Sequence, residues 1–198
     1  MSDRTDNESI TEIVPLTLTE FIEDNINDIK ETDIDFPAPH RRLNLPAVTV
    51  SAPDPDFAPT GVPYPIKDVE DSDITNSQAQ VEWIVGEYNF ELQLDLWAGS
   101  KEELDDKFDE LFNVLNPKIT PMGVTLPMEK YYNINCDYLY TGHTRTSGEG
   151  ESQRDEWRMT MTILATCKAV RSKKEFIIEE TEIVSEINKD ILVVTEND

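Results

Sequence analysis

Apolar and polar residues alternate over the middle of the chain. From Ile84 to Leu96 every second residue is apolar or glycine, while the intervening residues from Glu87 to Asp95 are polar. Successive side chains of a strand point to opposite faces, so this pattern predicts a long strand with one solvent-exposed face. The residues on its other face are Ile84, Gly86, Tyr88, Phe90, Leu92, Leu94 and Leu96.

A helix is predicted directly after this strand. Ser100 and Glu103 have the spacing of a capping box, in which the two side chains satisfy backbone N–H groups at a helix start. Asn116-Pro117 ends the helical pattern. We expect Phe108 to be fully buried on the sheet. The apolar residues at helical spacing are Leu104, Phe108, Leu111, Phe112 and Leu115.

The sequence of the N-terminal part predicts a flexible acidic leader, residues 1–15, that is followed by another helix. Thr17 and Glu20 form a second capping box just behind Pro15, so we expect the helix to start there. A helix of this length is marginal in isolation and must dock its apolar stripe. That stripe consists of Leu18, Phe21 or Ile22, Ile26 and Ile29.

Eight of the twelve prolines lie within residues 36–66. Proline lacks an N–H and fixes φ, which excludes regular helix and central strand from this region. The β-branched run Ala47–Ser51 is the exception and predicts a short edge strand. The rest should cross the surface as an extended arm, either as a plain linker or as a strap over a neighbouring subunit.

Two further alternating runs, Tyr132–Tyr140 and Trp157–Val170, predict an antiparallel hairpin. Cys136 and Cys167 each fall on its buried side. We interpret them as reduced core thiols, with a disulfide as the alternative.

The polar connection 142–156 is too long for a tight turn and should project from the hairpin. We take its ionisable residues as a candidate interface or channel-facing site. These residues are His143, Arg145, Glu149, Glu151, Arg154 and Asp155.

Residues 172–198 are expected to form a C-terminal acidic arm. Glu175–Glu179 and Asp190–Val194 are short strand-like runs, which suggests docking on another chain or on a sheet edge. The expected fold class is therefore α+β: a mainly antiparallel sheet with helices packed on one face, plus extended N- and C-terminal arms. Residues 16–171 are expected to form a single domain.

The formal net charge of −24 disfavours binding to nucleic acid or to an anionic membrane, because both require basic residues to replace counterions. Neither a signal peptide nor a membrane span is predicted, which favours a cytosolic protein. His40 and His143 lie beside no candidate nucleophile, and no phosphate-binding or metal-ligand motif is present. We therefore predict no catalytic, cofactor or metal residues.

The order of these elements resembles the tail terminator family of long-tailed bacteriophages and the related neck, or tail-completion, proteins. The resemblance rests on Tyr88–Ala98 leading into Lys101–Leu115, and on the hairpin Tyr132–Val170. It implies a homo-oligomeric ring, expected to be a hexamer, that caps the tail tube and joins it to the head–neck connector proteins. It also implies a virion protein, assembled in the host cytoplasm, through which DNA passes without specific binding.

Two alternatives remain from other classes of protein. One is another oligomeric tail, neck or baseplate adaptor, which needs the same arms at a different place in the particle. The other is a metal-dependent enzyme, which would require a deep pocket with shifted carboxylates.

Overall fold

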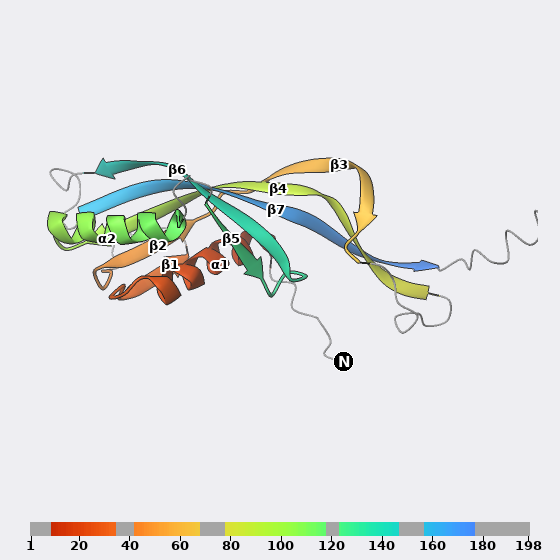
Figure 1. The fold of residues 1–198 in the computed structure, drawn as a ribbon, viewed down its shortest axis with the longest axis horizontal. Helices are drawn as coiled ribbons and strands as arrows, with labels where there is room; N and C mark the ends of the chain where they lie inside the picture. Colours follow the sequence, from red (N-terminus) through yellow and green to blue (C-terminus); the bar gives the residue numbers. More distant parts are fainter. Residues whose placement is uncertain (1–8, 35–41, 68–77, 118–122, 147–156, 177–198) are drawn as a thin grey trace, which may run out of the picture. The chain divides into compact units, whose positions relative to one another are not determined.

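The computed structural model describes residues 9–34, 42–67, 78–117, 123–146 and 157–176, which form an α+β fold (Figure 1). Both predicted helices and all three long predicted strands are present in these residues, together with further strands. The helices are α1 (Ile10–Asn25) and α2 (Lys101–Leu115), and the strands are β1 (Glu31–Ile34), β2 (Ala47–Ser51), β3 (Asp56–Pro65), β4 (Gln78–Ala98), β5 (Val124–Met128), β6 (Ile134–Thr146) and β7 (Trp157–Phe176).

The strands form a mixed sheet in the order β1-β2-β4-β7-β6-β5, and β3 pairs with β4 outside this order. β1 and β2 are parallel, while the pairs β2–β4, β5–β6 and β6–β7 are antiparallel. The prediction that β2 is an edge strand was wrong, because β2 lies between β1 and β4. The nearest prolines, Pro46 and Pro53, flank β2 without entering it, so the strand keeps its backbone donors for both neighbours.

The chain divides into two compact units. Unit 1 comprises the described parts of 1–61 and 86–169, and unit 2 comprises the described parts of 62–85 and 170–198. Strands β3, β4 and β7 contribute residues to both units. Within unit 2, the backbone N–H of Ile66 donates to the carbonyl oxygen of Glu82 at 2.9 Å.

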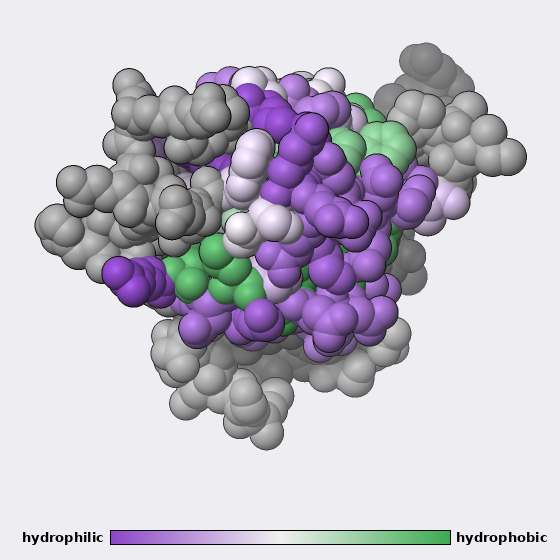
Figure 2. Space-filling model, turned by 90° about the vertical axis from the view of Figure 1, so that its left-hand side faces the viewer, coloured by the Kyte–Doolittle hydropathy of each residue, from purple (hydrophilic) through white to green (hydrophobic). Residues whose placement is uncertain are grey.

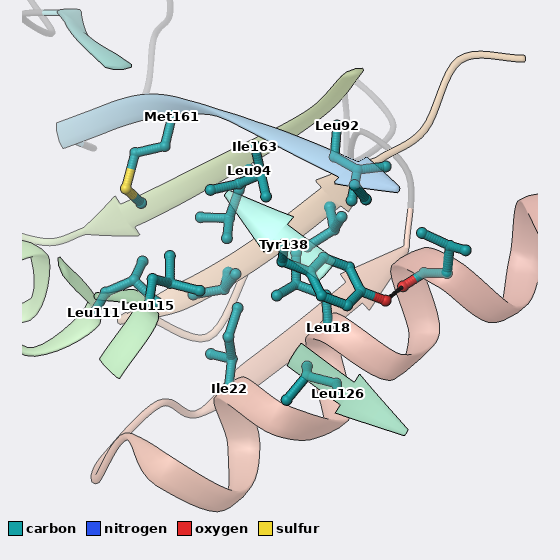
Figure 3. Close-up of a cluster of buried hydrophobic side chains, with 14 of the residues drawn as sticks. Leu18, Ile22, Leu92, Leu94, Leu111, Leu115, Leu126, Tyr138, Met161 and Ile163 are labelled. Carbon is teal, nitrogen blue, oxygen red and sulfur yellow. Dashed lines mark hydrogen bonds between the residues drawn. The ribbon is translucent and has the colours of Figure 1, made fainter. Parts of the chain in front are cut away.

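The hydrophobic core of unit 1 lies between the sheet and the two helices, which pack on the same face of the strands (Figure 1). Figure 3 shows side chains from both helices and from β4, β5, β6 and β7 converging there. The Tyr138 hydroxyl donates to the backbone carbonyl of Val14 at 2.8 Å and so ties β6 to α1. The residues labelled in that view are Leu18, Ile22, Leu92, Leu94, Leu111, Leu115, Leu126, Tyr138, Met161 and Ile163.

Helix α1 begins earlier than predicted. It starts at Ile10 and includes Pro15, so residues 10–15 belong to the helix and not to a flexible leader. The buried side chains of Ile13 and Val14 extend the stripe that continues in Leu18 and Ile22. Burial of this longer stripe offsets the backbone hydrogen bond that the proline nitrogen cannot make. Residues 1–8 lie outside the described part of the chain.

The predicted strand and helix in the middle of the chain are confirmed as β4 and α2. Phe90, Leu92, Leu94 and Leu96 are buried on the core face of β4. The N–H of Glu103 donates to Ser100 Oγ at 3.1 Å, and Glu103 Oε2 accepts from the N–H of Gly99 at 2.7 Å, which forms the expected cap.

The hairpin strands β6 and β7 are longer than predicted. β6 continues through Thr146, and β7 continues to Phe176 beyond the predicted end at Val170. A register shift between Tyr140 and Gly142 marks an irregularity in the pairing of β6 with β7. The register skips Thr141, and Gly142 pairs with Thr162. Because this extra residue shifts the alternation, the pattern of the preceding residues did not reveal that the strand continues.

Candidate interface sites

An aromatic cluster joins β6 to α2 in unit 1. It consists of Phe108, Phe112, Tyr140 and His143. The His143 ring lies 4.7 Å from the Phe108 ring, and Tyr140 meets Phe112 edge-on at 5.4 Å. Such ring pairs add roughly 0.5–1.5 kcal/mol beyond the burial of their area. The cluster therefore fastens the end of β6 to the helix.

Polar contacts complete this arrangement. The Tyr140 hydroxyl and His143 Nδ1 are hydrogen-bonded, and partial burial raises the pKa of Tyr140. Arg145 forms an ion pair with Asp105 of α2, and both side chains are partly exposed. An exposed pair of this kind contributes little stability, so the aromatic contacts dominate.

Only two of the six candidate residues of the predicted polar loop lie in the described part of the chain. His143 and Arg145 belong to β6 and both contact α2, although they were predicted to lie in a projecting loop. Glu149, Glu151, Arg154 and Asp155 lie outside the described residues. Phe108 was expected to be fully buried but is only partly so, since it faces His143 at the margin of the core.

Figure 2 views the molecule from the side at which β6 ends and α2 begins. Its described surface is largely hydrophilic, with small apolar areas between polar side chains. Phe112 contributes to the exposed apolar surface of unit 1, since 38% of it is accessible to solvent. The described surface in this view therefore shows small apolar areas rather than a broad apolar patch.

A second polar site lies on the sheet face opposite the helices. Asp95 was predicted on the solvent-exposed face of β4, yet it is only 1% exposed. Arg158 Nε and Nη2 donate to its two carboxylate oxygens at 3.0 and 2.8 Å. Thr160 Oγ1 donates to the same carboxylate at 2.6 Å, and Gln93 Nε2 does so at 2.8 Å. The carboxylate is therefore fully engaged.

Trp97 covers this ion pair. The guanidinium carbon of Arg158 lies 5.0 Å from the centre of the Trp97 ring, and Trp97 Nε1 donates to Thr49 Oγ1 at 3.1 Å. This site was not predicted from the sequence. The alternation did place Gln93 and Asp95 on one face of the strand, but it gave no register between β4 and β7.

Strand β3 carries three of the exposed large hydrophobic side chains of the described residues. Its relative exposure is 47% at Phe57, 77% at Val62 and 45% at Tyr64. Residues 57–66 contain no charged side chain, in a chain of which 29% is charged. Gly86 of β4 allows β3 to approach closely, because a Cβ there would lie 2.4 Å from the carbonyl oxygen of Ala58.

A groove of about 410 Å³ lies between α1 and β5. Glu20, Asp24 and Glu129 line it together with Lys130 and apolar side chains. In the described residues no group of three or more His, Cys, Asp or Glu side chains is placed to hold a metal ion.

The described helices include none that is long and apolar enough to cross a membrane. Comparison of the sequence with protein-family models and with curated proteins finds no match in either case.

Proposed function

We propose that this protein is a structural subunit of a long-tailed bacteriophage virion. In this proposal it forms a homo-oligomeric ring, with six copies as the expected number, that terminates the tail tube and joins it to the head–neck connector. The principal support is strand β3, an exposed apolar strand without charge in a strongly acidic chain.

Electrostatics explains why this strand suits contacts between copies. Two chains of net charge −24 repel each other, and the repulsion is smallest where a surface carries no charge. Val62 and Tyr64 alternate with prolines, so both side chains project from the same face of β3. Burial of exposed apolar side chains of this size favours association.

The prolines of β3 also restrict the mode of contact. Pro59, Pro63 and Pro65 carry no N–H, so a further strand cannot form a complete ladder with β3. Association must then use side chains rather than edge-to-edge strand addition. A side-chain contact that repeats with a fixed rotation between copies produces a ring when that rotation closes on itself. An open strand edge instead permits further strand addition.

The terminal segments are the second part of this proposal. Residues 1–8 and 177–198 would act as arms that clasp neighbouring copies, since the run Ile191-Leu192-Val193-Val194 is apolar within an acidic context. β7 ends at Phe176, so a truncation should begin at Ile177 and leave the strand intact. This truncation should weaken ring formation, and unchanged sedimentation would refute the role of the arm.

Sedimentation of a charge variant tests the interface. Val62→Asp combined with Tyr64→Asp places charge on β3 and should shift the protein from rings to monomers. Asn135→Asp adds one negative charge at an exposed position of β6 and should leave the rings intact. Equal sedimentation of both variants would exclude β3 as the contact surface.

Tube length tests the position in the virion. Tail tube protein from the same particle should polymerise into tubes of uncontrolled length, and adding this protein should cap them. Rings that bind tube protein without limiting tube growth would instead identify another tail, neck or baseplate adaptor.

A further inference from the structure

Cys136 of β6 and Cys167 of β7 are directly opposite each other in the antiparallel register. Both are free thiols, and they are 0% and 2% exposed. Opposed residues in antiparallel strands have Cα atoms about 4.5 or 5.5 Å apart, depending on the type of pair. Both values fall within the roughly 4.4–6.8 Å that a disulfide spans.

We propose that Cys136 and Cys167 form a reversible intramolecular disulfide when the folded protein meets a small two-electron oxidant such as hydrogen peroxide. The pair is therefore a site of covalent modification within the core. This inference does not rest on the proposed function, because it concerns a single folded copy.

The reaction balances with peroxide as the only added reagent. The sulfur of one cysteine attacks a peroxide oxygen, the O–O bond breaks, and a sulfenic acid and one water form. The second sulfur then attacks the sulfenic sulfur, and the S–O bond breaks with release of the second water. Two thiols are oxidised to one disulfide, and hydrogen peroxide is reduced to two waters.

Either thiol can begin the reaction. The two cysteines are directly opposed and similarly buried, so access favours neither of them. The thiolate is the reactive form of cysteine. The cysteine that ionises first attacks peroxide, and the opposed cysteine resolves the sulfenic acid.

Burial sets which oxidants can act. A molecule the size of peroxide needs little opening of the core, whereas a bulky disulfide reagent needs β6 and β7 to separate. The crosslink would join two neighbouring strands of the core sheet close to Tyr138, whose hydroxyl contacts α1. It should therefore form without unfolding and leave the fold intact.

Mass spectrometry of the full-length protein tests the inference. The folded protein is treated with hydrogen peroxide, the excess is removed with catalase, and the chain is alkylated with iodoacetamide in denaturant. The expected product has lost both alkylation sites together, weighs two hydrogen atoms less than the reduced chain, and yields a crosslinked Cys136–Cys167 peptide. Dithiothreitol should restore both sites.

Single variants test the resolving step. Cys136→Ser and Cys167→Ser each retain one thiol and should accumulate a sulfenic acid that dimedone traps, whereas the unsubstituted protein should be labelled several-fold less because its second thiol resolves the sulfenic acid. Peptide mapping of the unsubstituted protein gives a result even where a variant fails to fold. Two alkylatable thiols remaining at a peroxide dose that oxidises free glutathione, or disulfides formed only between chains, would overturn the proposal.

Discussion

Arg158 donates two hydrogen bonds to Asp95 from the neighbouring strand, on the face of the sheet that carries no helix. Asp95 is almost fully buried, while 24% of the Arg158 side chain remains exposed. The pair thus combines a buried carboxylate with a cation that reaches solvent. Its value for stability depends on both partners being present, because a buried charge without a partner is costly.

Replacement of Arg158 should show how far stability depends on the complete ion pair. Arg158→Met leaves the Asp95 carboxylate buried without its cation and should lower the free energy of unfolding by about 3 kcal/mol. Urea unfolding followed by circular dichroism measures the loss. The double variant Asp95→Asn with Arg158→Met should lose less than Arg158→Met alone, because no uncompensated charge remains.

The ion pair of Lys168 with Glu87 is the matched control. Both of its side chains are more than 40% exposed, at 42% and 43%. Lys168→Met should therefore cost no more than about 1 kcal/mol. Equal losses for Lys168→Met and Arg158→Met would mean that Asp95 is not buried in solution.

Gly86 should tolerate no side chain. Alanine at this position would place its Cβ 2.4 Å from a backbone oxygen of β3 and 2.6 Å from the Phe57 ring. Backbone cannot move aside cheaply, so we expect Gly86→Ala to cost about 1–3 kcal/mol in thermal or urea unfolding. Gly142→Ala meets no atom within 4 Å and should change stability by less than about 0.5 kcal/mol.

Helix α2 should show a steep difference between its buried and half-exposed positions. Leu111 is 0% exposed, so Leu111→Ala should cost about 2–5 kcal/mol. Phe112 is 38% exposed, and Phe112→Ala should cost clearly less although it removes more atoms. Phe108→Ala should fall between the two. A larger loss for Phe112→Ala than for Leu111→Ala would mean that α2 is rotated on the sheet.

Tyr138 should contribute to unfolding at alkaline pH. Burial raises its pKa well above the ordinary value of 10.0. The unfolded chain ionises this phenol near pH 10 whereas the folded chain does not, so its contribution is complete below that pH and is lost as the pH rises further. Tyr138→Phe should be less stable at neutral pH by about 1 kcal/mol, through loss of the bond to Val14.

The measurement is the free energy of unfolding as a function of pH in the alkaline range. Between neutral pH and pH 11, the stability of Tyr138→Phe should fall less steeply than that of the unsubstituted protein. Tyr132→Phe is the control, since the side chain of Tyr132 lies outside the buried core. Parallel pH profiles for the unsubstituted protein and Tyr138→Phe would contradict the burial of this hydroxyl.

Local pattern was enough to predict the elements that form the core. The alternation ending at Leu96, the capping box at Ser100 and the stripe of α2 depend only on residues near one another in the chain. The same reasoning placed Cys136 and Cys167 on buried faces of their strands, which the structure confirms. The predicted start of the first helix behind Pro15 was wrong. Local pattern includes the cost of a proline within a helix, but not the burial of Ile13 and Val14 that offsets it.

The sequence by itself determined which faces of its strands and helices are apolar, since the periods of strand and helix act within a few residues. The pairing of β6 with β7 was predicted from the sequence, but only the tertiary structure decided the other strand neighbours and the register. These determine that Arg158 meets Asp95, that His143 meets α2 and that the two cysteines face each other. Strand order and register follow from packing between segments far apart in the chain. A single sequence contains no local signal for such pairings.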